Sequence, residues 1–174
     1  MSDWDAFLEM LAPQTGERIL DVGAGKGELA SRISRIAAGA EVYAVDPNTR
    51  KVAAMKRDHP EVKATSAGAE SLPFADGFFD KVFTTMALHH YADVDRALGE
   101  ITRVLKPGGS FTVLEVEPGS AKGAMFRLFG RLMGEHMTLM TEEQLSTRLM
   151  KAEGLKVVRA ASVGSGYLIQ LSRV

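Results

Sequence analysis

A glycine-rich loop behind an acidic residue is the first place in this sequence where residue types and spacing could do chemistry. Asp21 lies two positions before Gly23–Gly27, whose glycines follow the spacing Gly-x-Gly-x-Gly. Such glycines permit unusual dihedrals and let a ligand approach the main chain closely. A carboxylate here can accept hydrogen bonds from a ligand ammonium group, whereas it would repel a pyrophosphate. The dinucleotide fingerprint Gly-x-Gly-x-x-Gly is not met, because Glu28 stands where its last glycine would be.

A second carboxylate, Asp46, occurs 25 positions after Asp21 and is followed by Pro47. At the end of a strand, a carboxylate can accept hydrogen bonds from both hydroxyls of a ribose, which indicates a nucleoside group in the ligand. The alternative is that Gly23–Gly27 is only a tight turn and Asp46 only caps the next helix. The agreement of two separate strand ends favours the ligand site.

Two adjacent histidines and two glutamates are candidates for contact with a second reactant. His89 and His90 follow a predicted strand, at the edge where open α/β sheets bind ligands, and either could act as a general base near neutral pH. Local packing is the favoured alternative, because one of two neighbouring side chains usually points away. Glu115 and Glu117 could touch this second reactant or lie on the surface. Their spacing matches no familiar metal site, so none is expected.

The segment 119–140 is rich in methionine, leucine and phenylalanine. Flexible thioethers suit an adaptable apolar pocket or lid, and a helix packed on the sheet is the alternative. The residues expected to line a pocket for the second reactant are Met125, Phe129 and Met133. Arg127 and Arg131 lie one helical turn apart and could bind an anion, although a solvated face is favoured. We therefore expect 119–153 to be a helical insertion on the side where the second reactant, the acceptor, binds.

Alternating strands and helices position these residues. Apolar runs predict strands at Arg18–Val22, Glu41–Val45, Val62–Ser66, Asp80–Thr85 and Ser110–Val116. Helical periodicity predicts helices near Trp4–Leu11, Glu28–Ala37, Thr49–Asp58 and Val94–Leu105, and a capping box predicts another at Thr141–Ala152. This alternation is typical of a doubly wound, mostly parallel α/β sheet. The candidate strands Lys156–Val163 and Tyr167–Val174 are separated by three residues, which predicts an antiparallel hairpin.

Composition narrows the class of protein. The 174 residues fit a single domain, with 1–15 as an N-terminal helical cap. A net charge of -1 without a long basic run gives no bulk-charge support for binding nucleic acid or membrane, although local patches are compatible with it. No membrane span or signal peptide is expected. The absence of cysteine excludes disulfides and thiolate metal sites and fits a cytoplasmic location.

Several ordered motifs together resemble the class I, seven-stranded S-adenosylmethionine-dependent methyltransferases, in particular the ubiquinone/menaquinone-biosynthesis group. The matching stretches are Ile19–Gly27, Val45–Asp46, Ala69–Phe74, Phe79–Asp80, Ala87–His90 and Arg103–Gly109. The resemblance runs from about Arg18 to Val116. It implies a seven-stranded sheet whose C-terminal strand is antiparallel, S-adenosyl-L-methionine as cofactor, and a small-molecule methyl acceptor.

The resemblance also assigns roles to individual residues. Asp21 would face the methionine ammonium, and Asp46 with Pro47 would hold the ribose. The methionine part would lie on Gly23, Ala24, Gly25 and Gly27, the adenine beside Ala69 and Glu70, and the methionine end near Thr85 and Met86. In this family an aspartate often precedes the Ala-Glu pair, but here that residue is Gly68. Adenine recognition is then expected to use backbone near Ala69, apolar packing, or Glu70.

Methyl transfer from a sulfonium chiefly requires alignment of donor and acceptor, since proximity alone can remove ~7–11 kcal/mol of barrier. No dedicated nucleophile is evident. Two other functions stay open: a non-catalytic, cofactor-binding or partner-activating subunit, and an NAD-dependent oxidoreductase. The methyl acceptor and the oligomeric state do not follow from the sequence.

Overall fold

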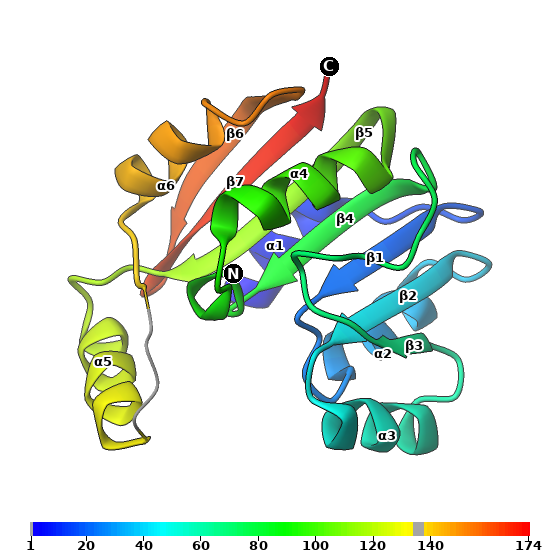
Figure 1. Cartoon of the computed structure of the whole chain (residues 1–174), viewed down its shortest axis with the longest axis horizontal. Coiled ribbons are helices and arrows are strands. Elements are labelled where there is room, and N and C mark those ends of the chain that lie inside the picture. Colours follow the sequence, from blue (N-terminus) through cyan, green and yellow to red (C-terminus); the bar gives the residue numbers. More distant parts are fainter. Residues whose placement is uncertain (1, 134–137) are drawn as a thin grey trace.

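The computed structural model describes residues 2–133 and 138–174, apart from the side chain of Met133, and contains one seven-stranded sheet in the order β3-β2-β1-β4-β5-β7-β6 (Figure 1). The strands are β1 (Arg18–Val22), β2 (Glu41–Asp46), β3 (Lys63–Ser66), β4 (Phe79–Thr85), β5 (Leu105–Val116), β6 (Leu155–Val163) and β7 (Gly166–Arg173). The helices are α1 (Asp3–Leu11), α2 (Glu28–Ile36), α3 (Thr49–Asp58), η1 (Leu88–His90), α4 (Val94–Val104), α5 (Ala121–Met133) and α6 (Glu142–Leu149).

The strand directions confirm the predicted fold class. Strands β1 to β5 pair in parallel, with a helix in each connection except that from β3 to β4, whereas β7 runs antiparallel to both β5 and β6. The short β6–β7 connection begins at Gly164, whose φ of 48° lies in the left-handed region that a tight hairpin requires. The terminal hairpin is therefore antiparallel, as the sequence predicted.

Helices cover both faces of the sheet. One buried cluster joins the sheet to α4 and α6, and the other joins it to α1, α2 and α3. Helix α1 is fixed at two points: Phe7 packs against Phe83 of β4 with ring centroids 5.4 Å apart, and Gln170 of β7 donates to the carbonyl of Met10 at 2.7 Å. The N-terminal helix is thus part of the core rather than an appendage.

Two predicted boundaries were wrong by more than one residue. Strand β5 begins at Leu105 instead of Ser110, because an irregularity in the β4–β5 register lets residues 106–109 extend the strand. The capping box at Thr141 is present, but α6 ends at Leu149 instead of Ala152. None of the described helices combines the length and hydropathy needed to cross a membrane.

Candidate active site

A cavity of about 720 Å³ lies at the carboxyl ends of β1, β2 and β4. Eleven residues predicted from the sequence line it: Asp21, Gly23, Ala24, Gly25, Asp46, Pro47, Ala69, Glu70, Thr85, Met86 and His90. Strand β1 lies between β2 and β4, so the ends of three parallel strands meet at one edge. Asp21 and Asp46, from two neighbouring strands, therefore share one cavity.

Asp21 is buried in the floor of this cavity without a complete set of partners. Its side chain is 1% exposed, and Oδ1 has no hydrogen-bond partner among the described residues. Burial, together with the negative charge of Asp46, holds the pKa of Asp21 well above its usual range. A buried polar atom left unpaired is costly, and a cationic ligand group would relieve both the missing bond and the buried charge.

The glycine loop holds its shape through the main chain. The N–H groups of Gly23 and Ala24 donate to the carbonyl of Val45 at 2.9 and 3.0 Å. Gly23 has φ 84°, and a Cβ at this position would lie 2.5 Å from the Cβ of Ala87. Only glycine satisfies both conditions, so this residue keeps the loop open beside the ligand space.

Asp46 connects the loop to β2 and retains capacity for a ligand. Its Oδ2 accepts from the N–H of Gly25 at 2.9 Å, and its Oδ1 accepts from the N–H of Asn48 at 2.9 Å. A carboxylate offers about four lone-pair sites, so about two stay available to ligand hydroxyls. Asp46 thus holds the glycine loop beside β2 and is also a candidate ligand contact.

Glu70 lines the cavity, but one of its oxygens is already committed. Oε1 accepts from the N–H groups of Ala92 and Asp93 at 2.8 and 3.3 Å, which ties Glu70 to the start of α4. A Cβ at Gly68 would lie 3.1 Å from Oε2 of Glu70, so an aspartate there would crowd a like charge. The glycine that departs from the family pattern is consistent with this arrangement.

Met86 occupies strained backbone at the end of β4. Its φ of 51° lies in the left-handed region, which L residues rarely adopt, and its N–H donates to the carbonyl of Leu114 at 2.8 Å. Strain of this kind gathers at functional sites when the surrounding structure fixes it. Thr85 and Met86 both face the cavity.

Sequence reasoning missed Tyr91 and Trp4, which also line the cavity. The hydroxyl of Tyr91 donates to the carbonyl of Val22 at 3.1 Å and lies 2.9 Å from Oγ1 of Thr84, and burial raises its pKa. Trp4 belongs to α1 and reaches the cavity only because that helix packs on the sheet. Neither residue belongs to a motif that would mark it in the sequence.

The two histidines separate as expected of an adjacent pair. His90 lines the cavity, while His89 is 3% exposed and its Nδ1 donates to Oε2 of Glu115 at 2.7 Å. The other oxygen of Glu115 accepts from the N–H of Leu88 at 2.8 Å. Nε2 of His89 has no partner among the described residues. His89 and Glu115 thus form a buried pair behind the wall of the cavity. The prediction that Glu115 contacts a ligand in the cavity was therefore wrong.

Three further predicted residues lie away from the cavity. Gly27 is the N-cap of α2, where a Cβ would overlap the side chain of Met55, so it seats α2 against α3. Met125 and Phe129 are 59% and 57% exposed on α5 and do not line the cavity. The side chain of Met133 lies outside the described residues.

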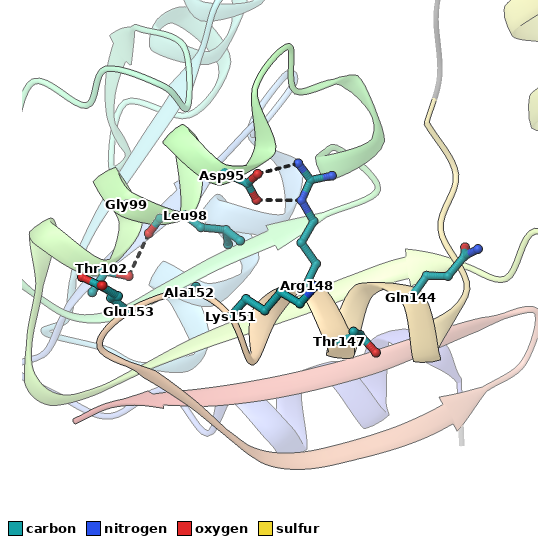
Figure 2. A pocket seen from close by; sticks show the side chains of 10 residues that line it. All are labelled: Asp95, Leu98, Gly99, Thr102, Gln144, Thr147, Arg148, Lys151, Ala152 and Glu153. Carbon is teal, nitrogen blue, oxygen red and sulfur yellow. Dashed lines mark hydrogen bonds and ion pairs between the residues drawn. The ribbon is translucent and has the colours of Figure 1, made fainter.

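A second cavity of about 530 Å³ lies between α4 and α6 (Figure 2). Arg148 crosses it to form a paired contact with Asp95, at 2.7 and 2.9 Å. None of the predicted site residues lines it, and it lies in the outer helical layer rather than at the ends of the strands. Within residues 2–133 and 138–174, no cluster of three or more acidic or histidine side chains could hold a metal ion.

Comparison with known proteins gives a consistent result. The methyltransferase domain family matches residues 20–113. A demethylmenaquinone methyltransferase of Thermus thermophilus is 38% identical over 128 residues, which cover 70% of this chain and 58% of that protein. The ubiquinone/menaquinone biosynthesis C-methyltransferase UbiE of Rubrivivax gelatinosus is 39% identical over 63% of this chain and 43% of its own length. The chain spans about half the length of these relatives.

Solved structures share the fold. An S-adenosylmethionine dependent methyltransferase from Mesorhizobium loti has a TM-score of 0.85 at 19% identity, covering 99% of this chain and 98% of that chain. A SAM dependent methyltransferase from Aquifex aeolicus has a TM-score of 0.81 at 20% identity, covering 99% and 90%.

Proposed function

The chain belongs to the methyltransferase domain family, whose class I members use S-adenosyl-L-methionine, and on this premise we propose that it transfers a methyl group to a small molecule. The cofactor would lie in the cavity at the ends of β1, β2 and β4. Residues 1–174 would work as one methyltransferase domain, with 1–15 as a cap and 119–153 on the acceptor side. A cytoplasmic location stays a prediction.

One observation carries the proposal: two carboxylates with different environments face one cavity. Asp21 is buried with an unpartnered oxygen, which suits an ammonium group, whereas Asp46 is held by main-chain N–H groups and can still accept from hydroxyls. An aminoacyl nucleoside carries an ammonium at one end and ribose hydroxyls in its middle. The Gly23–Gly25 main chain lines the same cavity, and a Cβ on Gly23 would overlap the side chain of Ala87. The residues present therefore fit the cofactor.

S-adenosyl-L-methionine would supply an activated methyl group on a sulfonium. Asp21 would anchor the methionine end, Asp46 with Pro47 would fix the ribose, and the main chain near Ala69 would receive the adenine, because Glu70 is tied to α4. Thr85 and Met86 would border the reacting centre. The contribution of these residues is orientation and exclusion of water.

We propose His90, which lines the cavity, as the proton acceptor for a methyl acceptor that must lose a proton. The ring of His89 lies behind it, with ring centroids 4.3 Å apart, and the contact between His89 and Glu115 holds that buried ring in place. In this role His90→Gln should lower kcat at least tenfold and leave the affinity for S-adenosylhomocysteine unchanged. His59→Gln is the matched control. A fall in cofactor affinity with unchanged kcat would contradict this role.

The acceptor class follows from the relatives rather than from the cavity. Their names specify demethylmenaquinone and ubiquinone/menaquinone biosynthesis, so a quinone-like ring is the first acceptor to test. Calorimetry with S-adenosylmethionine and S-adenosylhomocysteine tests the proposal directly, with NAD as the competing ligand. A labelled-methyl assay against a metabolite extract then identifies the acceptor. Absence of binding at millimolar concentration, or preference for NAD, would contradict the proposal; binding without turnover would favour a non-catalytic subunit.

A further inference from the structure

Helix α5 carries a continuous apolar face that points into solvent. Met125, Leu128, Phe129 and Leu132 are 59%, 61%, 57% and 75% exposed. Their spacing of i, i+3, i+4 and i+7 places all four on one side of the helix. We name these four residues the outer face of α5. Figure 1 shows α5 standing apart from the sheet, beyond the end of β5.

The opposite edge of α5 explains why its apolar face points outward. Gly123 and Gly130, seven positions apart, are both buried. A Cβ at Gly123 would overlap the carbonyl of Glu117, so only glycine allows this approach. Phe126 also faces inward and meets the ring of His89 edge-on, with ring centroids 5.8 Å apart. The helix thus contacts the chain through small residues and one aromatic ring.

The charge of α5 is entirely positive. Residues Ala121–Met133 include Lys122, Arg127 and Arg131 and no acidic residue, in a chain whose net charge is -1. Arg127 donates to the carbonyl of Pro118, and it shares the exposed flank of the helix with Arg131 one turn later. Helix α5 therefore has a net positive charge beside its outer face, although the chain as a whole does not.

We propose that the outer face of α5 binds an anionic lipid surface. A helix with exposed leucine, phenylalanine and methionine on one side and arginine or lysine beside them lies in the interface of such a membrane. Two copies meeting symmetrically through this face would instead bring like-charged helices together. Charge complementarity therefore favours lipid over a second copy of the chain.

The inward side of α5, opposite the outer face, lies close to the candidate active site. Phe126 contacts His89, whose neighbour His90 lines the cavity. A membrane-bound α5 would hold the cavity near the lipid, where an apolar acceptor resides. This link to catalysis rests on the proposed function, whereas lipid binding does not.

Vesicle sedimentation tests the proposal. The intact chain should sediment with vesicles that contain phosphatidylglycerol and stay in solution with phosphatidylcholine alone. The double variant Leu128→Glu/Leu132→Glu should bind anionic vesicles at least tenfold more weakly. Ile36→Glu and Val158→Glu are matched controls, because these residues are 53% and 62% exposed on α2 and β6. Both controls should bind as the unmodified chain does.

Three outcomes would overturn the proposal. The first is no binding to anionic vesicles, and the second is equal loss in the controls. The third is a dimer in light scattering that the double variant dissociates, which would assign the face to a second copy. S-adenosylhomocysteine affinity is measured in every variant. If the unmodified chain does not bind S-adenosylhomocysteine, the proposed function is refuted, whereas the result on lipid binding stands by itself.

Discussion

Replacing Asp21 with asparagine should weaken S-adenosylhomocysteine binding and raise the thermal stability of the ligand-free protein. The two effects have one cause. In the ligand-free chain the carboxyl group is buried, 1% exposed, with Oδ1 unpartnered among the described residues. Asparagine has the same shape and no charge, so it removes the buried acid and, with it, the partner for a ligand ammonium.

The size of each effect follows from this environment. A hydrogen bond to a charged group contributes about 1.5–3 kcal/mol, so its loss should weaken binding by about 10- to 150-fold. Because burial raises the pKa of Asp21, folding at neutral pH must bury a charge or take up a proton, and asparagine removes this cost, which is on the order of 1 kcal/mol or more. For a domain of this size, each kcal/mol raises Tm by about 2–4 °C. We expect the ligand-free Asp21→Asn variant to melt several degrees higher.

Calorimetry and thermal denaturation measure the two effects separately. 5′-Methylthioadenosine is the matched ligand, because it keeps the ribose and adenine but lacks the ammonium group. Its affinity should be the same for the Asp21→Asn variant and the unmodified protein. An equal loss for both ligands, or a lower Tm with unchanged S-adenosylhomocysteine affinity, would refute the reasoning.

Three further predictions concern the same cavity. Because the pKa of Asp21 is raised and the ammonium requires its ionised form, S-adenosylhomocysteine affinity should fall as pH is lowered through that pKa, and this dependence should vanish in Asp21→Asn; calorimetry across pH measures it. Gly23→Ala should lower the free energy of unfolding by about 2–4 kcal/mol, because the residue has φ 84° and its Cβ would lie 2.5 Å from Ala87. Gly25→Ala should lower it by only about 1–2 kcal/mol, because no atom lies within 4 Å of its Cβ, and melting curves compare the two variants. Asp46→Asn should weaken S-adenosylhomocysteine and methylthioadenosine alike, by about tenfold, since the amide cannot accept from both loop N–H groups; calorimetry that shows only one ligand affected would contradict this.

Much of the fold could be predicted because local and global signals agree. The apolar run Arg18–Val22 and the helix Thr49–Asp58 have the predicted bounds. The convergence of Asp21 and Asp46 followed from topology, since neighbouring parallel strands end at the same edge. These features depend on patterns that a few adjacent residues carry.

Other features depend on tertiary contacts that no local pattern encodes. The pairing of Glu115 with His89 joins residues 26 positions apart and turns a predicted acceptor contact into a buried hydrogen bond. The orientation of α5 could not be predicted either, because the apolar residues Met125 and Phe129 predicted a pocket and are exposed in the structure. The useful signal was the pair Gly123 and Gly130, whose small size marks the packed edge.

The fixing of α1 has a consequence for biosynthesis. The bond from Gln170 to Met10 spans 160 positions, and Trp4 of the same helix borders the cavity. At about 5–20 residues per second, the ribosome adds β7 on the order of 10 s after α1. A nascent chain can assemble both carboxylates well before the last strand secures the helix that carries Trp4. Ligand competence should therefore mature only after β7 has been added, when this strand meets a helix made 160 positions earlier.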